Sequence, residues 1–308
     1  MNHVIVTGAT GLIGSRLVKE LLAAGMRVTA TARSPTREVE VELGVPFVQL
    51  DVLRHSPDRP VLPSADCLIH CATANDIISK TPADGFELSV TGTWNVLAMA
   101  VRLAIPRVVY FSTFQVYGTE LSGRIDESTP VHCETAYGLN HWFGEEVCRM
   151  QAAKHKLSVA VVRPSNVYGA PVASTVNRTT LVPACFVRDA LQHGEIRLLS
   201  SGRQLRNFVS TQEVARDCLS LLADFPADFS ITNICSPYSA TIHDVALVTA
   251  DIYKERFGKA LPVRVMGSEP PATNRFQAQS RLKSAWKNES SPGETMRKEI
   301  RLLYNTVQ

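Results

Sequence analysis

The apolar positions of the chain form short β-branched runs that alternate with amphipathic stretches through roughly the first 165 residues. A short run rich in valine and isoleucine is typical of a buried strand, whereas apolar residues three and four apart are typical of one helix face. Strands are predicted at residues 4–7, 27–32, 47–50, 67–71, 107–111 and 158–163, and helices at 12–24, 86–103 and 134–155. This alternation predicts βαβ units, and hence an α/β fold with a doubly wound parallel sheet.

The alternation becomes less regular after Pro164. Helices are predicted there at 182–193, 211–223, 241–257 and 295–304, with strand-like pieces at 207–209 and 231–234 and polar loops at 171–181 and 267–274. We therefore expect a sheet domain over residues 1–165 and a smaller C-terminal α/β lobe over 166–308. The chain from about 207 to 235 is expected to return to the sheet.

Three glycines separate the first predicted strand from the first predicted helix. Gly8 would let the backbone turn, Gly11 would leave room for a pyrophosphate, and Gly14 would let helix and strand pack closely. The free N–H groups at the start of that helix would then face the phosphates. This spacing predicts a Rossmann-type dinucleotide site formed by Gly8, Gly11, Leu12, Ile13 and Gly14, and an ordinary βα turn without a ligand is the alternative.

The end of the second predicted strand indicates which dinucleotide binds. A carboxylate about 20 residues past the glycines would bond a ribose 2′-hydroxyl and favour NAD. The chain has Ala32 and Arg33 there, with Arg37 nearby, and a guanidinium suits a 2′-phosphate. We therefore predict NADP(H) in preference to NAD(H), with a solvated surface arginine as the alternative. Asp51, after the third strand, is predicted to accept from the adenine amino group, or else to be an exposed loop residue.

Composition excludes several other classes of protein. The 308 residues are 45% hydrophobic and carry a net charge of +3, so a large core is expected, and no nucleic-acid or membrane partner. The seven cysteines are scattered without metal-ligand spacing, which indicates reduced thiols and no metal site. No apolar stretch approaches the ~18 residues of a membrane span. Because the first strand begins almost at once, no signal peptide is expected, and we predict a cytoplasmic protein.

Polar side chains that can transfer protons follow the fifth predicted strand. Ser112 and Thr113 would lie at the carboxyl edge of the sheet, where open α/β sheets bind ligands. Tyr137 and His141 are four residues apart and would share one helix face. A tyrosine hydroxyl beside a cationic or donor group can exchange a proton. A purely structural Tyr–His pair is the alternative.

Further motifs carry a resemblance to a known family. They are Gly-Thr-Trp-Asn-Val-Leu at 92–97, Ser-Thr…Val-Tyr-Gly at 112–118, Arg-Pro-Ser-Asn-Val-Tyr-Gly at 163–169, Gly-Arg-Gln-Leu-Arg-Asn-Phe-Val at 202–209, Asn-Ile-Cys-Ser at 233–236 and the segment 279–286. With these, the chain resembles, nearly end to end, an extended short-chain dehydrogenase/reductase of the NAD(P)-dependent nucleotide-sugar epimerase/dehydratase family.

The resemblance implies roles for matching residues. Thr113 would bond the sugar oxygen at the reacting carbon, and Tyr137 would exchange a proton with that oxygen. Asn166 and Arg206 would hold the substrate diphosphate in the smaller lobe, and Gln115 would also touch the substrate. The implied cofactor contacts further include Val52, Cys71, Ala72, Ser112, Tyr137, His141 and Pro164. A homodimer through the helices at 86–103 and 134–155 is also implied.

The chain departs from the family pattern at three places. The family's lysine, four residues after the tyrosine, is His141 here, and a neutral imidazole donates one hydrogen bond without supplying a charge. The Asp-Glu pair that 4,6-dehydratases use is Phe114-Gln115, and neither side chain is a general acid. This change argues against a 4,6-dehydratase. Ser89 stands where the family usually has asparagine.

Three functional hypotheses follow. The first is NADPH-dependent reduction at C4 of a 4-keto-6-deoxy sugar nucleotide, with Tyr137 as the proton donor. The second is a nucleotide-sugar C4-epimerase with tightly bound NAD, which the missing acid after the second strand disfavours. The third is a catalytically impaired binding or regulatory relative, for which the evidence is His141.

Overall fold

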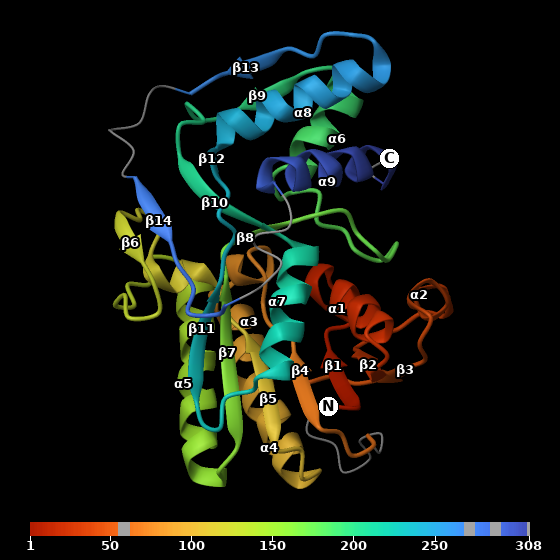
Figure 1. Cartoon of the computed structure of the whole chain (residues 1–308), viewed down its shortest axis with the longest axis vertical. Coiled ribbons are helices and arrows are strands. Elements are labelled where there is room, and N and C mark those ends of the chain that lie inside the picture. The colour runs from red at the N-terminus through yellow and green to blue at the C-terminus, as the bar shows by residue number, and fades with distance from the viewer. Residues whose placement is uncertain (55–61, 268–274, 284–290, 307–308) are drawn as a thin grey trace.

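The centre of the protein is a seven-stranded parallel sheet, seen in a computed structural model that describes residues 1–54, 62–267, 275–283 and 291–306 (Figure 1). The strand order is β11-β7-β5-β4-β1-β2-β3. The strands are β1 (His3–Thr7), β2 (Arg27–Ala32), β3 (Phe47–Gln49), β4 (Cys67–His70), β5 (Arg107–Phe111), β7 (Ser158–Pro164) and β11 (Ser230–Ile234). The order reverses between β1 and β4, which is the switch point where doubly wound sheets open a crevice. The predicted Rossmann-type fold is confirmed.

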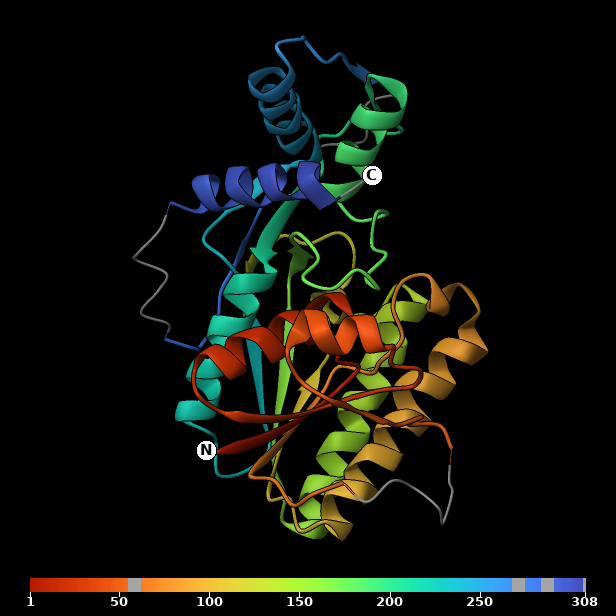
Figure 2. The same ribbon diagram turned by 90° about the vertical axis from the view of Figure 1, so that its right-hand side faces the viewer.

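Helices cover both faces of the sheet (Figures 1 and 2). Successive side chains of a strand point to opposite faces, so Val4 and Val6 pack on one side and Ile5 on the other. The first face is covered by α1 (Leu12–Ala23), α2 (Arg37–Leu43) and α7 (Thr211–Ala223). The second is covered by α4 (Gly92–Arg102) and α5 (Ala136–His155).

The predicted helix at 86–103 is a composite. The chain passes from a 3₁₀ turn, η1 (Ile78–Lys80), through α3 (Pro82–Phe86) and a π-helical turn, η2 (Glu87–Thr91), into α4. In this turn the Thr93 hydroxyl donates to the carbonyl of Ser89 at 2.5 Å, and the Ser89 hydroxyl accepts from the backbone N–H of Ala74 at 3.1 Å. These side-chain bonds compete with the regular backbone pattern, and a period of apolar residues does not reveal them.

Other boundaries differ from the predictions by one or a few residues, because caps decide where helices begin. The helix predicted from residue 134 begins at Ala136, since the Thr135 side chain accepts from the N–H of Gly138. Likewise α8 (Ile242–Phe257) begins after Thr241, which forms a capping box with Asp244. Residues 171–181 contain no helix or strand, as predicted. Most of the predicted loop 267–274 lies outside the described residues, as does the end of segment 279–286.

A smaller α/β lobe lies above the carboxyl end of the sheet (Figure 1). Its strands form the pairings β12-β10-β8, β13-β9 and β14-β6. They are β6 (Gly123–Ile125), β8 (Asn166–Tyr168), β9 (Ile196–Leu198), β10 (Leu205–Ser210), β12 (Ser239–Thr241), β13 (Val263–Val265) and β14 (Phe276–Ala278), joined by α6 (Ala184–His193), α8 and α9 (Pro292–Thr306). The lobe has its own core, which includes Phe186, Phe208, Val245 and Ile300.

The chain crosses between the two parts more than once. After β10 it returns to the sheet, where Val214 and Leu221 of α7 pack in the same core as α1. It then forms the edge strand β11, which pairs in parallel with β7. This return places the end of β7 and the start of β8 beside β10, at the boundary of lobe and sheet. No described helix is long and apolar enough to cross a membrane.

Candidate functional site

The glycine turn between β1 and α1 has the geometry that its spacing predicts. Gly8 has a φ of +65°, in the region where glycine is favoured. A Cβ on Gly14 would lie 2.3 Å from the carbonyl oxygen of Gly8, so helix and strand pack directly on each other's backbone. No side chain caps α1, and its first turn carries no acidic residue. The turn therefore leaves a helix N-terminus with partial positive charge open to an anion.

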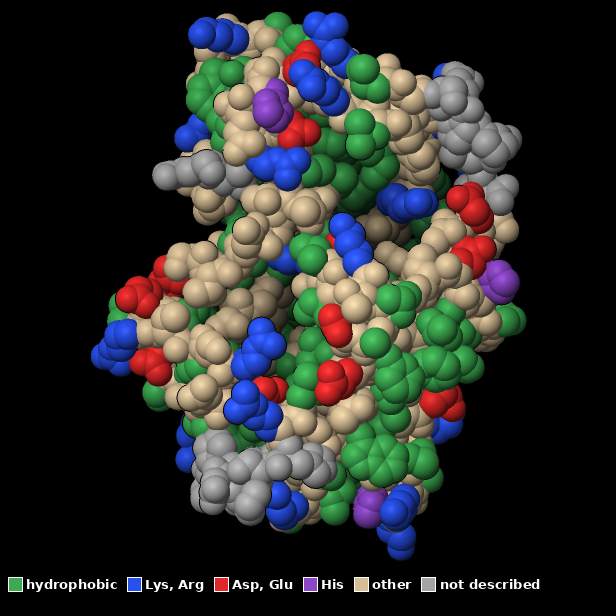
Figure 3. Space-filling view, turned by 180° about the vertical axis from the view of Figure 1, so that it is seen from behind, with side chains coloured by type: hydrophobic (Ala, Val, Ile, Leu, Met, Phe, Trp, Pro, Cys, Tyr) green, Lys and Arg blue, Asp and Glu red, His purple; other side chains and the backbone are tan. Residues whose placement is uncertain are grey.

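This turn opens into a cavity of about 510 Å³ between the sheet edge and the lobe. Figure 3 shows the surface hollowed where the two parts meet. Of the predicted site residues, those that line the cavity are Gly8, Gly11, Leu12, Ile13, Gly14, Cys71, Ser112, Thr113, Gln115, Tyr137, His141, Pro164, Asn166 and Arg206. The structure thus brings glycine turn, hydroxyl groups and lobe residues together. Arg33, Asp51, Val52 and Ala72 are not among its lining residues.

Thr113 and Tyr137 come together through a close backbone approach. Thr113 follows β5 and begins the 3₁₀ turn η3 (Phe114–Tyr117). The first turn of α5 packs on that segment, because a Cβ on Gly138 would lie 2.7 Å from the carbonyl oxygen of Gln115. The Tyr137 side chain thereby lies near that of Thr113, and both line the cavity. Burial raises the pKa of Tyr137, and the Thr113 side chain opposes that rise.

His141 lies one helical turn further along α5, with its ring edge-on to Tyr137 at 4.7 Å between centroids. Its Nε2 is 3.0 Å from the carbonyl oxygen of Ala74, and its Nδ1 is 3.5 Å from the hydroxyl of Tyr110. Burial lowers the pKa of His141 to about 4, although the carbonyls of Ala74 and Phe111 oppose this. At neutral pH the imidazole is therefore uncharged, and the Ala74 carbonyl takes its Nε2–H.

The end of β5 is held by a buried ion pair. Ser112 donates to Glu145 of α5 at 2.5 Å, and Arg163 of β7 binds the same carboxylate through Nε at 2.9 Å and Nη2 at 2.5 Å. The Arg163 guanidinium also lies 4.9 Å from the ring centre of Tyr117. Ser112 is thus occupied in positioning the segment that carries Thr113.

The lobe contributes an amide and a guanidinium to the cavity. Asn166 and Arg206 are on the neighbouring parallel strands β8 and β10. Asn166 donates through Nδ2 to the carbonyl of Asn207 at 2.9 Å, and Arg206 donates to the carbonyl of Leu205 at 3.1 Å. No carboxylate among the described residues lies within ion-pair distance of Arg206. Burial lowers the pKa of Arg206, and Glu120 opposes that shift. An unpaired, partly buried cation of this kind suits an anionic ligand.

The residues predicted around the adenosine lie further along the sheet edge. Arg33 directly follows β2 and is exposed. No ion pair of its guanidinium occurs within the described part of the chain. Asp51 accepts from the N–H of Leu53 and lies 3.3 Å from Arg54, so its carboxylate is already partly engaged. The buried Val52 offers its carbonyl to Asn95.

Two charged residues that line the cavity were not predicted as site residues from the sequence. Asp76 lies in the loop after β4, and Arg178 in the polar loop 171–181. Arg178 Nη2 and Asp76 Oδ1 form an ion pair at 2.5 Å across 102 residues of sequence. No local sequence pattern marks either residue, because they come together only where their two loops meet in the folded chain.

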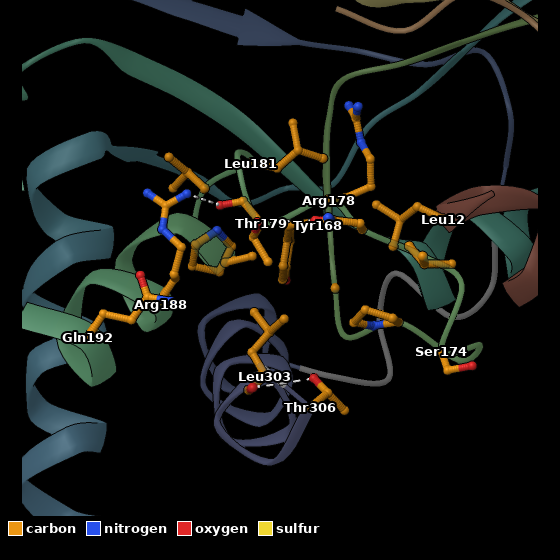
Figure 4. Close-up of a pocket in the computed structure, with 17 residues that line it drawn as sticks. Leu12, Tyr168, Ser174, Arg178, Thr179, Leu181, Arg188, Gln192, Leu303 and Thr306 are labelled. Carbon is orange, nitrogen blue, oxygen red and sulfur yellow. Dashed lines mark hydrogen bonds between the residues drawn. The ribbon is translucent and has the colours of Figure 1, made fainter. Parts of the chain in front are cut away.

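A second cavity of about 360 Å³ lies on the other side of loop 171–181. Figure 4 shows Arg188 and Gln192 of α6 on one side of it and Leu303 and Thr306 of α9 on another. Arg188 is engaged with Asp189 and with the carbonyl of Thr179. This cavity therefore presents no free charged group to a ligand among the residues described.

Comparison with known proteins finds relatives whose names refer to sugar nucleotides. It is 28% identical over 236 residues to a dTDP-4-dehydro-6-deoxy-D-allose reductase of Streptomyces, covering 71% of this chain and 72% of that one. It is 26% identical over 224 residues to a putative UDP-glucose 4-epimerase of Methanocaldococcus jannaschii, covering 71% and 73%.

Solved structures share the fold over almost the whole chain. A UDP-galactose 4-epimerase superposes with a TM-score of 0.81 at 21% identity, covering 99% of this chain and 100% of that one. A dTDP-glucose 4,6-dehydratase of Streptomyces venezuelae, solved with NAD bound, superposes with a TM-score of 0.82 at 22% identity, covering 98% and 97%. The family model of NAD-dependent epimerases and dehydratases matches residues 4–235, which include the glycine turn, Thr113, Tyr137 and Arg206. The chain therefore belongs to the NAD-dependent epimerase/dehydratase family.

Proposed function

We propose that this protein is an NAD(P)-dependent oxidoreductase that reduces the C4 keto group of a 4-keto-6-deoxy sugar nucleotide with NADPH. The observation that carries the proposal is one cavity that joins the glycine turn, the neighbouring Thr113 and Tyr137 and the unpaired Arg206. Such a reaction needs three groups in one place: a dinucleotide, a hydroxyl that exchanges a proton, and a cation that binds the anionic part of the substrate.

The residues at the turn fit a dinucleotide. Gly11 presents no side chain, and a Cβ there would lie 3.2 Å from the carbonyl oxygen of Gly8. The uncapped first turn of α1, with Leu12, Ile13 and Gly14, offers backbone N–H groups to the pyrophosphate. A bound nicotinamide dinucleotide would supply the hydride.

The protein's own groups would then bind and protonate the substrate. Thr113 would orient the C4 oxygen, and the Tyr137 hydroxyl would give that oxygen a proton as the bond order falls. Asn166 and Arg206 would hold the diphosphate, for which the Arg206 guanidinium has free donors. Phe114 and Gln115 offer no general acid to eliminate water, which supports reduction over 4,6-dehydration.

Arg33 supports NADPH as the reductant. It is exposed beside the expected position of the adenosine ribose, where a carboxylate would repel a 2′-phosphate. Calorimetric titration with NADPH and with NADH tests this choice. We expect tighter binding of NADPH, and Arg33→Ala should weaken NADPH binding while NADH binding stays the same. Tighter binding of NADH would contradict it.

A C4-epimerase is the second candidate, and similarity to the UDP-glucose 4-epimerase of M. jannaschii supports it. Net oxidation of cofactor separates the two reactions, because an epimerase returns the hydride to the same sugar. The decisive assay follows NADPH absorbance with a panel of 4-keto-6-deoxy sugar nucleotides. Stoichiometric oxidation is expected. Retention of NAD(H) through purification, with interconversion of UDP-sugars and no net oxidation, would favour the epimerase.

A further inference from the structure

The neutral His141 leaves the proton-exchanging tyrosine without the charge that a lysine at this position would provide. The Nε2–H of His141 goes to the Ala74 carbonyl, and the ring is 2% exposed. An imidazole held in this way has no proton left to place near Tyr137 or a ligand. Any positive charge near the Tyr137 hydroxyl must therefore come from another element.

Arg178 is a cationic residue that can supply this charge within the cavity. It lines the same cavity as Thr113, Tyr137 and His141, and its side chain is only 19% exposed. Its stem borders the second cavity, but Figure 4 shows the guanidinium pointing away from that cavity. The Nη1 atom is buried and has no hydrogen-bond partner within the described residues.

Asp76 holds the guanidinium in place through Nη2. The carboxylate is 44% exposed, so solvent screens it more than it screens the arginine. The two charges act on Tyr137 in opposite directions, because Arg178 favours the phenolate and Asp76 disfavours it. Of the two, the effect of Arg178 on the Tyr137 pKa is the larger.

The other groups that face Tyr137 carry no compensating positive charge. They are the hydroxyl of Thr113, the neutral ring of His141, and the buried phenol of Tyr110 behind that ring. Arg178 and Asp76 are therefore the pair of full charges that act on this tyrosine within the described structure.

We propose that Arg178, anchored by Asp76 in the same cleft, is a positioning residue that supplies the positive charge acting on Tyr137, in place of a lysine on α5. A catalytic role for Arg178 rests on the proposed function. The effect of the Arg178 and Asp76 charges on the titration of Tyr137 does not, because it involves only residues of this chain. Stabilising the phenolate would make Tyr137 a better partner for reversible proton exchange at neutral pH.

The direct test is titration of Tyr137 in the ligand-free protein by NMR of [¹³Cζ]tyrosine, with the Tyr137→Phe variant identifying its resonance. Arg178→Gln should move the titration midpoint of Tyr137 upward. Arg178→Lys keeps the positive charge, so the Tyr137 midpoint in this variant should stay close to that of the unchanged protein. Asp76→Asn should move the midpoint downward. Either substitution breaks the same ion pair and would loosen the loop in the same way. Loosening alone would therefore not move the Tyr137 midpoint in opposite directions in the two variants.

An identical midpoint in Arg178→Gln, or shifts of the same sign in Arg178→Gln and Asp76→Asn, would overturn the proposal. A Tyr137 that stays protonated up to the pH of unfolding in every variant would overturn it as well. Circular dichroism and melting temperature check that each variant folds, and if Arg178→Gln does not fold, the downward shift in Asp76→Asn carries the test. None of these readouts needs a substrate, so they stand even if the proposed reaction is wrong.

Once a substrate is found, the pH profile of turnover gives a second readout. In the reverse reaction, where the phenolate of Tyr137 must take the proton of the C4 hydroxyl, Arg178→Gln should lower kcat at pH 7 about tenfold for each pH unit by which the tyrosine moves, with KM little changed and kcat recovering at higher pH. A pH-independent loss in kcat, or a loss confined to KM, would show a structural or substrate-binding role and overturn the proposal.

Discussion

At the residue scale, the chemistry proposed for the cleft depends on two neighbouring rings of α5. Tyr137 is partly buried against Thr113, and His141 is packed behind it with its N–H given to a backbone carbonyl. Burial acts on both in the direction of the neutral form, raising the pKa of Tyr137 and lowering that of His141. The two residues therefore favour a protonated phenol beside an uncharged imidazole.

Removal of the Tyr137 hydroxyl should abolish most of the activity and leave the fold intact. Tyr137→Phe is expected to lower kcat by about 10²–10⁴-fold, the range typical of a proton-transfer group. The measurement is NADPH oxidation with the best sugar nucleotide found. Tyr253→Phe, in the aromatic cluster of the lobe with Phe257 and Tyr304, is the matched control and should keep full turnover. Unchanged turnover in Tyr137→Phe would exclude the role.

His141 should make the protein sensitive to acid. Its pKa of about 4 in the fold lies below the ordinary value of 6.5, so the unfolded chain binds more protons between these values. Stability is therefore full above about pH 6.5 and falls as the pH drops towards 4, by on the order of 3 kcal/mol for this group. His70, with a pKa of about 3 through burial, acts in the same direction.

Urea unfolding at pH 7 and pH 5 measures this effect. His141→Gln keeps a donor for the Ala74 carbonyl and should lose less stability between the two pH values than the unchanged protein. His155→Gln, at the exposed end of α5, is the control and should retain the full loss. An equal loss in His141→Gln would show that this imidazole is not the acid-sensitive group.

At the element scale, the site depends on how closely α5 approaches the segment after β5. Gly138 makes that approach possible, because its missing Cβ would sit 2.7 Å from the Gln115 carbonyl oxygen. α1 and β1 are joined in the same manner through Gly14. The elements that carry the proposed catalytic and cofactor-binding residues are thus set by backbone contact.

Gly138→Ala should separate catalysis from cofactor binding. The added methyl must push α5 away from Gln115, at a cost of about 1–3 kcal/mol in stability, and a displacement of this size can cost on the order of 10²-fold in turnover. Affinity for NADPH, measured by calorimetry, should stay near normal because the glycine turn is untouched. Gly293→Ala in α9, where the nearest atom is 4.0 Å away, is the control. Normal turnover in Gly138→Ala would contradict this account.

At the scale of the whole molecule, the surface over α3–α5 exposes several large apolar side chains. Phe86 and Met150 are each 45% exposed and Trp94 42%. Helices α4 and α5 lie side by side on the outer face of the sheet (Figure 1). This surface is where the family resemblance places a partner subunit.

We predict a homodimer that forms through this surface. The double variant Trp94→Glu/Met150→Glu should be a monomer in analytical ultracentrifugation, because two buried charges would oppose association. Leu199→Glu is the control, since Leu199 is 87% exposed on the lobe and should not affect assembly. A monomeric unchanged protein, or a double variant that still dimerises, would refute the prediction.

The local sequence determined the parts of this protein that depend on near neighbours. The period of apolar residues predicted the parallel sheet and most helices, because burial of one face is a local property. The glycine spacing predicted the turn at β1–α1, since only glycine tolerates the φ of Gly8 and the approach at Gly14. The placement of Thr113 after a strand, and of Tyr137 and His141 on one helix face, was predicted in the same way from local spacing.

The long-range contacts were decided by the tertiary structure. The neutrality of His141 depends on the Ala74 carbonyl, 67 residues away, and the Arg178–Asp76 pair joins two loops 102 residues apart. Polar loops have no period that would fix the direction of a side chain, so loop 171–181 could be predicted only as a loop. The sequence determined the glycine turn, the hydroxyl groups and the lobe residues of the cleft. The packing of distant loops added Arg178 and Asp76 and decided which groups carry charge, because burial and ion pairing are properties of the folded chain.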